Sequence, residues 1–208
     1  MSKKLSLILL TLALLFTSCG TRSNNNTQTT TLSPTHDYGV LINGIRWATR
    51  NVDAPGTFAQ NPEDAGILFQ WNRRKGWNAV DRYVEGWDTS LPTGTKWYAE
   101  NDPCPKGWRV PTREELRLLR NADSEWATKN AVNGRLAGTA PYQIFLPASG
   151  WRCGNDGALY AVGVLGIYWS STQCGSAHAG HLWFGCDFVN VYDFWRQVGS
   201  SVRCVSIN

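Results

Sequence analysis

The residues best suited to ligand binding gather in one loop-rich segment of the chain. Between positions 71 and 98 it holds Trp71, Arg73, Arg74, Lys75, Trp77, Tyr83, Trp87, Trp97 and Tyr98. Exposed aromatic faces stack on sugar rings, and the guanidinium group of arginine binds carboxylates. The segment predicts a site for a glycan or protein ligand. Its candidate residues are Trp71, Arg73, Arg74, Trp77, Trp87 and Trp97. The alternative is that these rings form the core of a domain with little regular structure.

A second group of candidate ligands lies nearer the C-terminus. Cys174, His178, His181 and Cys186 are spaced closely enough to bind zinc, and Cys153 could add a further ligand. The spacing matches no recognised zinc finger, and solvated histidines in a hairpin loop explain it as well. We therefore expect no metal site and no other cofactor.

Two short polar segments carry only fragments of a lectin-type calcium site, namely residues 61–64 (NPED) and 154–157 (GNDG). Calcium requires six to eight oxygen ligands, so several carboxylates and amides must converge on it. Asn, Asp, Pro and Gly also dominate ordinary turns, which explains both segments without a metal.

Catalysis has little support in the sequence. The segment GWRVPTREEL, residues 107–116, is weakly similar to a helix start in formylglycine-generating enzymes, but the GNVWEW-like segment of those enzymes has no counterpart. We find no nucleophile beside a base. Helix capping accounts for Glu114 and Glu115, so the sequence predicts a protein that is not an enzyme.

The N-terminus predicts export and lipid anchoring. Lys3 and Lys4 precede an apolar run, Leu5–Phe16, which is shorter than the roughly 20 residues of a membrane-spanning helix and is typical of a signal peptide. Residues 1–18 then end at Thr-Ser before Cys19, as in a bacterial lipobox, where the cysteine is acylated. Phe16 departs from the usual aliphatic residue, and the alternative is ordinary secretion with Cys19 unmodified.

Residues 19–37 are polar and too poor in apolar side chains to fold, which predicts a flexible tether. An acylated Cys19 would make the protein an outer-membrane lipoprotein, on the periplasmic or the surface-facing leaflet. The tether lacks the acidic cluster associated with surface export, which favours the periplasmic face.

Residues 38–208 have the composition of one folded domain with a sizeable core. The chain has 20 basic and 16 acidic residues, and loss of Lys3 and Lys4 with the leader reduces the positive excess to two. This excess is small and no basic run accompanies it, so we expect no nucleic-acid partner.

The cysteines of an exported domain are usually paired. Cys104 lies in a proline-rich turn, NDPCPKGWRVP, directly before a predicted helix, and Cys204 lies in the last strand-like run, SVRCVSI. We predict a disulfide between them, which would join the end of the chain to the start of the helix. The partners of Cys153, Cys174 and Cys186 remain open.

The surrounding pattern predicts one main helix, short strands and long loops. Thr112 and Glu115 form a capping box for a helix from Arg113 to about Ala122, and a weaker helical turn is expected around Trp126. Asn43-Gly44 predicts a hairpin turn. Strand-like runs follow at 143–153, 166–173, 181–192 and 201–207, so the predicted class is α+β. Four tryptophans on this framework are expected in the core, namely Trp108, Trp151, Trp169 and Trp183.

Several motifs, in this order, resemble the Fibrobacter succinogenes major paralogous domain, common in exported lipoproteins of Bacteroidetes. They are INGIRWATRNVDAPGTFAQNPEDAGILFQWNR, NDPCPKGWRVPTREEL, FLPASGWR, YWSST and SVRCV. The resemblance covers residues 39–206. It implies a C-type-lectin-like fold with a small antiparallel sheet, and the Cys104–Cys204 pair fits that fold. The family has no established activity to transfer.

Together these features predict a lipid-anchored cell-envelope protein that binds or displays a glycan or protein ligand. The alternative is a structural or assembly component of the cell surface that has no small ligand.

Overall fold

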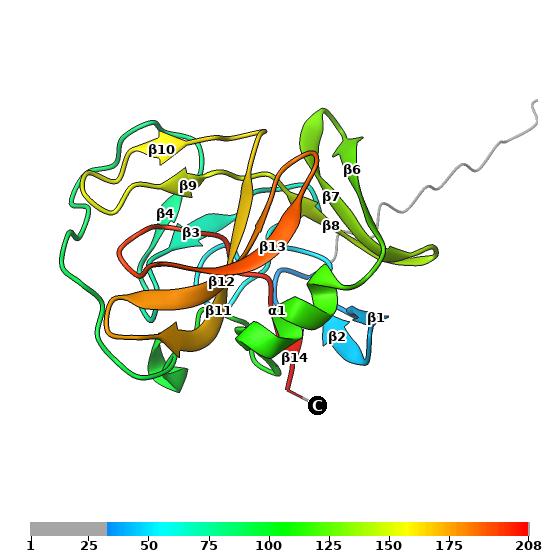
Figure 1. Cartoon of the computed structure of the whole chain (residues 1–208), viewed down its shortest axis with the longest axis horizontal. Coiled ribbons are helices and arrows are strands. Elements are labelled where there is room, and N and C mark those ends of the chain that lie inside the picture. Colours follow the sequence, from blue (N-terminus) through cyan, green and yellow to red (C-terminus); the bar gives the residue numbers. More distant parts are fainter. Residues whose placement is uncertain (1–32, 208) are drawn as a thin grey trace, which may run out of the picture. The chain divides into compact units, whose positions relative to one another are not determined.

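The computed structural model describes residues 33–207 (Figure 1). The predicted leader, the lipidation site Cys19 and most of the predicted tether lie outside this range. Within it, no helix is long and apolar enough to cross a membrane.

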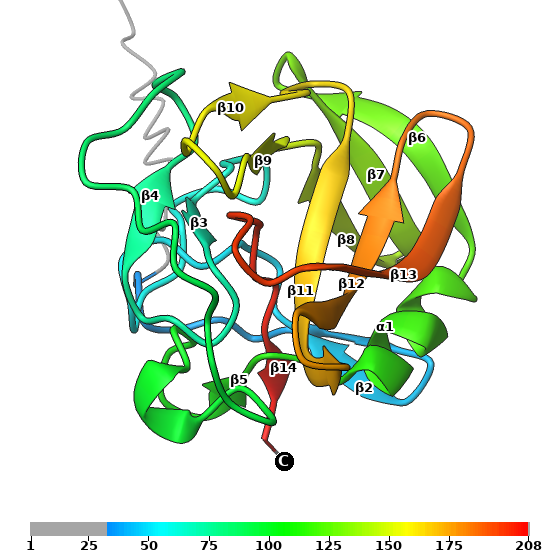
Figure 2. The same ribbon diagram turned by 60° about the vertical axis from the view of Figure 1, so that its left-hand side comes forward.

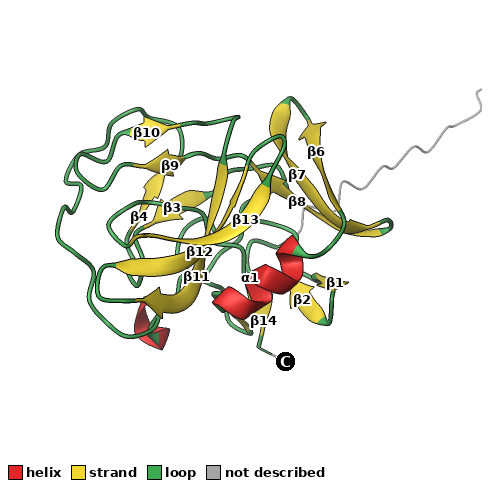
Figure 3. Cartoon of the chain, in the orientation of Figure 1, coloured by secondary structure: helices red, strands yellow, loops and turns green. Residues whose placement is uncertain are grey.

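The described chain is mostly β, with fourteen strands against one α-helix and one short 3-10 helix (Figure 3). The strands form several small antiparallel sheets, and the arrangement is closer to a β-sandwich than to an α+β domain. The prediction of an α+β, C-type-lectin-like domain was therefore wrong. Residues 76–78, predicted as loop, and the region of Trp126, predicted as a helical turn, are strands that pair with neighbouring strands of the chain.

The first sheet has the strand order β1-β2-β14-β5. Its strands are β1 (Val40–Ile42), β2 (Ile45–Trp47), β5 (Trp108–Arg109) and β14 (Val205–Ser206). The predicted hairpin joins β1 to β2: Asn43 and Gly44 both have positive φ, 48° and 81°, as the tightest hairpin turns require. The last strand thus lies between the N-terminal hairpin and the segment that leads into the helix.

Two three-stranded sheets supply most of the remaining β structure. One contains β6 (Ser124–Lys129), β7 (Val132–Thr139) and β8 (Tyr142–Pro147), and the other contains β11 (Gly166–Cys174), β12 (His178–Phe184) and β13 (Val189–Trp195). The helical turn expected around Trp126 was wrong, because Trp126 lies on β6 and pairs with Arg135 of β7. The run of residues 181–192 divides into β12 and β13 at a turn.

Two hairpin-like pairs and the 3-10 helix complete the fold. They are β3 (Ile67–Phe69) with β4 (Gly76–Asn78), β9 (Trp151–Arg152) with β10 (Leu159–Tyr160), and the 3-10 helix Ala99–Asn101. Between β4 and the 3-10 helix the chain forms a long loop, as the sequence predicts.

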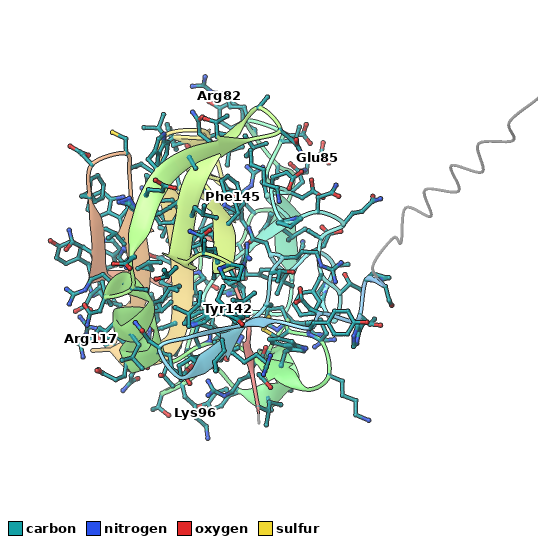
Figure 4. All side chains as sticks on the ribbon, turned by 90° about the vertical axis from the view of Figure 1, so that its right-hand side faces the viewer. Arg82, Glu85, Lys96, Arg117, Tyr142 and Phe145 are labelled. Atoms are coloured by element: carbon teal, nitrogen blue, oxygen red, sulfur yellow. A yellow bond between two sulfur atoms is a disulfide. The ribbon has the colours of Figure 1, made fainter. Side chains whose placement is uncertain are left out.

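The helix α1 (Arg113–Arg120) confirms the predicted cap. The Thr112 side chain accepts from the Glu115 backbone N–H, and the Glu115 carboxylate accepts from the Thr112 backbone N–H at 2.7 Å. Leu116 and Leu119 are buried, whereas Arg117 projects outward (Figure 4). The helix packs against β11, β12 and β13, so it covers one face of that sheet.

Four fully buried arginines connect the irregular segments. They are Arg50, Arg152, Arg196 and Arg203. Arg203, for example, donates to the Ala48 and Phe145 carbonyls and to the Asn51 side chain. Each guanidinium group therefore satisfies backbone oxygens that no sheet would otherwise pair.

The end of the predicted tether belongs to the folded unit. Asp37 is buried, accepts from the Thr49 backbone and hydroxyl, and pairs with Arg50 at 3.4 Å. Arg50 also donates to the carbonyls of Ser33 and His36. Residues 33–37, which lie ahead of the predicted boundary at residue 38, therefore contact the folded domain.

Cys104 and Cys204 form a disulfide across a separation of 100 residues. The pair is the one that the sequence predicts, and it lies beside β14, where the Cys204 carbonyl accepts from Ala48 N–H. Cys153, Cys174 and Cys186 are free thiols in the structure.

We expect Cys104→Ala, Cys204→Ala and the double change to lower the free energy of unfolding by the same amount, because each removes one shared cross-link. Loop-closure entropy for about 100 residues gives a loss on the order of 4–5 kcal/mol. Denaturant titration of the oxidised proteins measures it. A double variant clearly less stable than both single ones would contradict the shared cross-link.

Candidate functional site

The predicted site at residues 71–98 is largely interior. Trp71 is fully buried, and Trp97 and Trp77 are 6% and 7% exposed. The Trp71 indole donates to the Ser170 carbonyl, and Arg196 lies over its ring at 4.2 Å. These three rings cannot stack on a ligand, so their assignment as binding residues was wrong. The core alternative holds for them because the surrounding loops have few other apolar side chains to bury.

The other candidates in this segment are also engaged. Trp87 donates to the Gly154 carbonyl and packs on Trp77 with ring centroids 5.2 Å apart. Arg73 pairs with Asp88 and donates to Ser90, and Arg74 donates to the Asp102 carbonyl. Arg73 and Arg74 do line an open polar hollow of about 490 Å³ with Lys75 and Tyr98. No tryptophan is among the residues that line this hollow.

A different surface has the properties expected of a binding site, on the sheet β11-β12-β13. Because side chains alternate along a strand, Leu182 and Phe184 of β12 face the core that contains Leu116 and Leu119 of α1. His181 and Trp183 therefore point to the opposite face. Figure 2 shows α1 on one side of these strands and β9 with β10 on the other.

This opposite face forms a groove of about 720 Å³, here called the aromatic groove. Its lining residues are Trp151, Leu165, Ile167, His181, Trp183, Tyr192, Asp193 and Phe194. They come from β9, β11, β12, β13 and the loop before β11. Most of the surface that they present is carbon, with a few polar atoms between the rings.

The rings of the groove contact one another at angles. Trp183 lies 6.1 Å from Tyr192, Phe194 lies 5.5 Å from Trp151 and 5.1 Å from His181. Such tilted and edge-on contacts leave parts of the ring faces open. Tyr192 is 50% exposed. The chain from β10 to Leu165 of the groove, here called the rim, is also apolar where it meets solvent, with exposed side chains at Tyr160, Val162 and Val164.

Two polar atoms in the groove lack a hydrogen-bond partner, although both are shielded from water. They are Nδ1 of His181, a residue only 2% exposed, and Nε1 of Trp183. Burial lowers the pKa of His181 to about 4, with Asp193 opposing the shift and Arg113 adding to it. His181 is therefore neutral at pH 7. The Asp193 carboxylate is paired with Arg113 of α1 at 2.7 Å.

Comparison with protein families, curated proteins and solved structures found no match for this chain.

The geometry of the groove itself is therefore the basis for assigning a site. Trp151 and Trp183 were expected in the core, and this was wrong: both are only partly buried and line the groove. Trp169 is fully buried as expected. Trp108 is partly buried and packs against the core cluster that contains Trp71, Trp97 and Trp169. The signal that could have shown the groove is strand β13, VNVYDFW, in which aromatic residues occupy both alternating sets of positions.

The residues considered as metal ligands do not converge. His178 stacks against Trp195 with centroids 4.2 Å apart, and the Cys174 sulfur accepts from Arg113 at 3.1 Å. Within residues 33–207, no three His, Cys, Asp or Glu side chains are placed to hold one metal ion. The two calcium-like fragments form turns, with Asp64 accepting from Asn61 N–H and Asp156 from Ala158 N–H.

Replacing a core ring and replacing a groove ring should lower the free energy of unfolding by very different amounts. Trp71→Ala leaves a large cavity and an unpaired Ser170 carbonyl, so we expect a loss on the order of 3–5 kcal/mol. Tyr192→Ala should cost about 1 kcal/mol or less, because half of its side chain is already in water. Urea unfolding measures both. Equal losses would show that Tyr192 is part of the core.

The buried His181 should make the protein acid-sensitive. Its pKa of about 4 in the folded state lies below the ordinary value of 6.5. Between these values the unfolded chain binds a proton that the folded one does not, so stability falls as the pH drops from about 6.5 to 4. The full effect is on the order of 3 kcal/mol. Denaturant titrations at each pH measure the effect. Between pH 6.5 and 4 we expect the unfolding free energy of His181→Phe to fall less than that of the wild type, because carboxylate protonation affects both proteins equally.

Proposed function

We propose that this protein is a lipid-anchored binding protein of the cell envelope, and that its ligand occupies the aromatic groove. The observation that carries the proposal is a groove of about 720 Å³ lined by five rings, with a half-exposed tyrosine at its edge. Ligand pockets typically measure about 300–1,000 Å³ and combine apolar walls with a few polar groups. The aromatic groove fits this description better than the polar hollow at Arg74.

Binding rather than catalysis fits the groups present in the groove. His181 is its only side chain that could act as a base near neutral pH, and it is buried, with no nucleophile among the lining residues. The Asp193 carboxylate is held by Arg113. The groove offers contact surface and two hydrogen-bonding nitrogens, which suits recognition.

The envelope setting comes from the sequence. The lipobox at Cys19 supports a lipid anchor in the outer membrane, on either leaflet, and the resemblance to the Fibrobacter succinogenes major paralogous domain agrees with it. The net positive charge is small and the groove is apolar, so neither feature is suited to binding nucleic acid. Ser33 is held by Arg50, so about thirteen residues separate Cys19 from the folded unit.

A structural or assembly role is the second candidate. The exposed side chains of Tyr160, Val162 and Val164 give the rim of the groove an apolar surface of the kind that marks protein interfaces. In that role a protein partner would cover the rim, and the groove would hold no small ligand.

Glycan and peptide arrays probed with the full-length protein test the proposed function. We expect binding that falls at least tenfold in Trp183→Ala, because an aromatic anchor at the centre of a site typically contributes more than about 1 kcal/mol. Tyr142→Ala is the matched control: Tyr142 is 66% exposed on β8 and is not among the groove's lining residues. Binding that Trp183→Ala leaves unchanged would overturn the assignment of the groove, and blank arrays would favour the assembly role.

A further inference from the structure

The unpartnered nitrogens of His181 and Trp183 restrict the chemistry of whatever enters the groove. They belong to alternate residues of β12 on one face, so their Cα atoms lie about 6.6 Å apart along the strand. The Trp183 indole N–H can only donate a hydrogen bond. In neutral His181, Nδ1 either donates or accepts, depending on which nitrogen carries the proton. A ligand must therefore offer a hydrogen-bond acceptor to Trp183 and either a donor or an acceptor to His181.

Hydroxyl groups meet both demands, since each can donate and accept. A carboxylate or phosphate can accept at both points only if Nδ1 of His181 carries the proton, and an ammonium group, which only donates, cannot accept from Trp183. An entirely apolar side chain would leave both nitrogens buried and unpaired, at a cost comparable to a lost hydrogen bond for each. The polar part of the groove thus favours a ligand with several hydroxyl groups.

The charge of the groove favours a neutral ligand. Asp193 is its only acidic lining residue, and that carboxylate is already paired with Arg113. No lysine or arginine is among the lining residues. A ligand with a net charge would lose water on entry without gaining an opposite charge.

The ring walls favour a ligand with flat apolar faces. Trp151, Trp183, Tyr192 and Phe194 surround the two nitrogens with aromatic carbon. A pyranose ring has apolar C–H faces that stack on aromatic rings, and hydroxyl groups around its edge. It can place its faces on these walls while its edge reaches His181 and Trp183.

We propose that the aromatic groove binds a neutral carbohydrate, with a pyranose ring stacked on its aromatic wall and hydroxyl groups bonded to His181 Nδ1 and Trp183 Nε1. This inference rests on the proposed function and names its ligand class. Both nitrogens are covered in the structure, so a neighbouring side chain must move when the sugar enters. Tyr192 is the most exposed of the lining rings and has the most room to do so.

The test measures binding of the full-length protein to soluble neutral oligosaccharides of gluco, galacto and manno configuration, with uncharged aromatic-rich peptides as the comparison set. Isothermal calorimetry follows the wild type, His181→Phe and Trp183→Phe. Both changes keep an aromatic ring and remove the nitrogen. We expect at least one oligosaccharide to bind, and each variant to weaken that binding about tenfold or more.

His178→Phe is the matched control, because it makes the same change on the same strand at a residue outside the groove lining. Sugar binding that both groove variants retain would overturn the proposal. Peptides that bind through Trp183 while the sugars do not would overturn the carbohydrate class but leave the proposed function standing. If neither set binds, both fail. Unfolding midpoints show whether each variant is folded. If His181→Phe does not fold, Trp183→Phe alone provides the test.

Discussion

The fold depends on buried guanidinium groups that satisfy the carbonyls of irregular backbone. Most sheets here have only two or three short strands, so many backbone oxygens have no strand partner. Arg152 donates to Asn78, Asp81 and Gly157, and Arg196 to Gly94, Gly175 and His178. Each joins segments that lie far apart in sequence. Lysine could not replace them, because it lacks the planar fork of five donors. Separate small sheets become one structure through these contacts.

The same contacts explain which tryptophans are inside. Trp71 lies beneath Arg196, so a ring from a loop becomes part of the core. Trp183 lies on a regular strand, yet its face of the sheet is only partly covered, by the short β9 and β10. A position in a loop or a strand therefore says little about burial in this protein. What decides burial is whether another segment packs on that face.

Features set by neighbouring residues could be predicted from the sequence. The capping box needs only Thr112 and Glu115, three positions apart, and the hairpin turn needs only Asn43 and Gly44. The disulfide could be predicted because the expected export to an oxidising compartment and two local sequence patterns indicated the same pair of cysteines. Trp126 was misread because a short apolar pattern fits helix or strand equally, and β7 decides it. The groove could not be predicted, since it exists only where β9 and β13 come together.

The position of β14 has a consequence for how the protein is made. Val205 pairs with both Trp47 and Arg109, so the final residues of the chain hold the middle of the first sheet. Synthesis delivers these residues after β2 and β5. Until then β2 and β5 each keep an open edge, and Cys104 has no partner. A chain cut before residue 204 lacks the central strand and the cross-link together, so the first sheet and its disulfide both wait for the same three residues, 204–206.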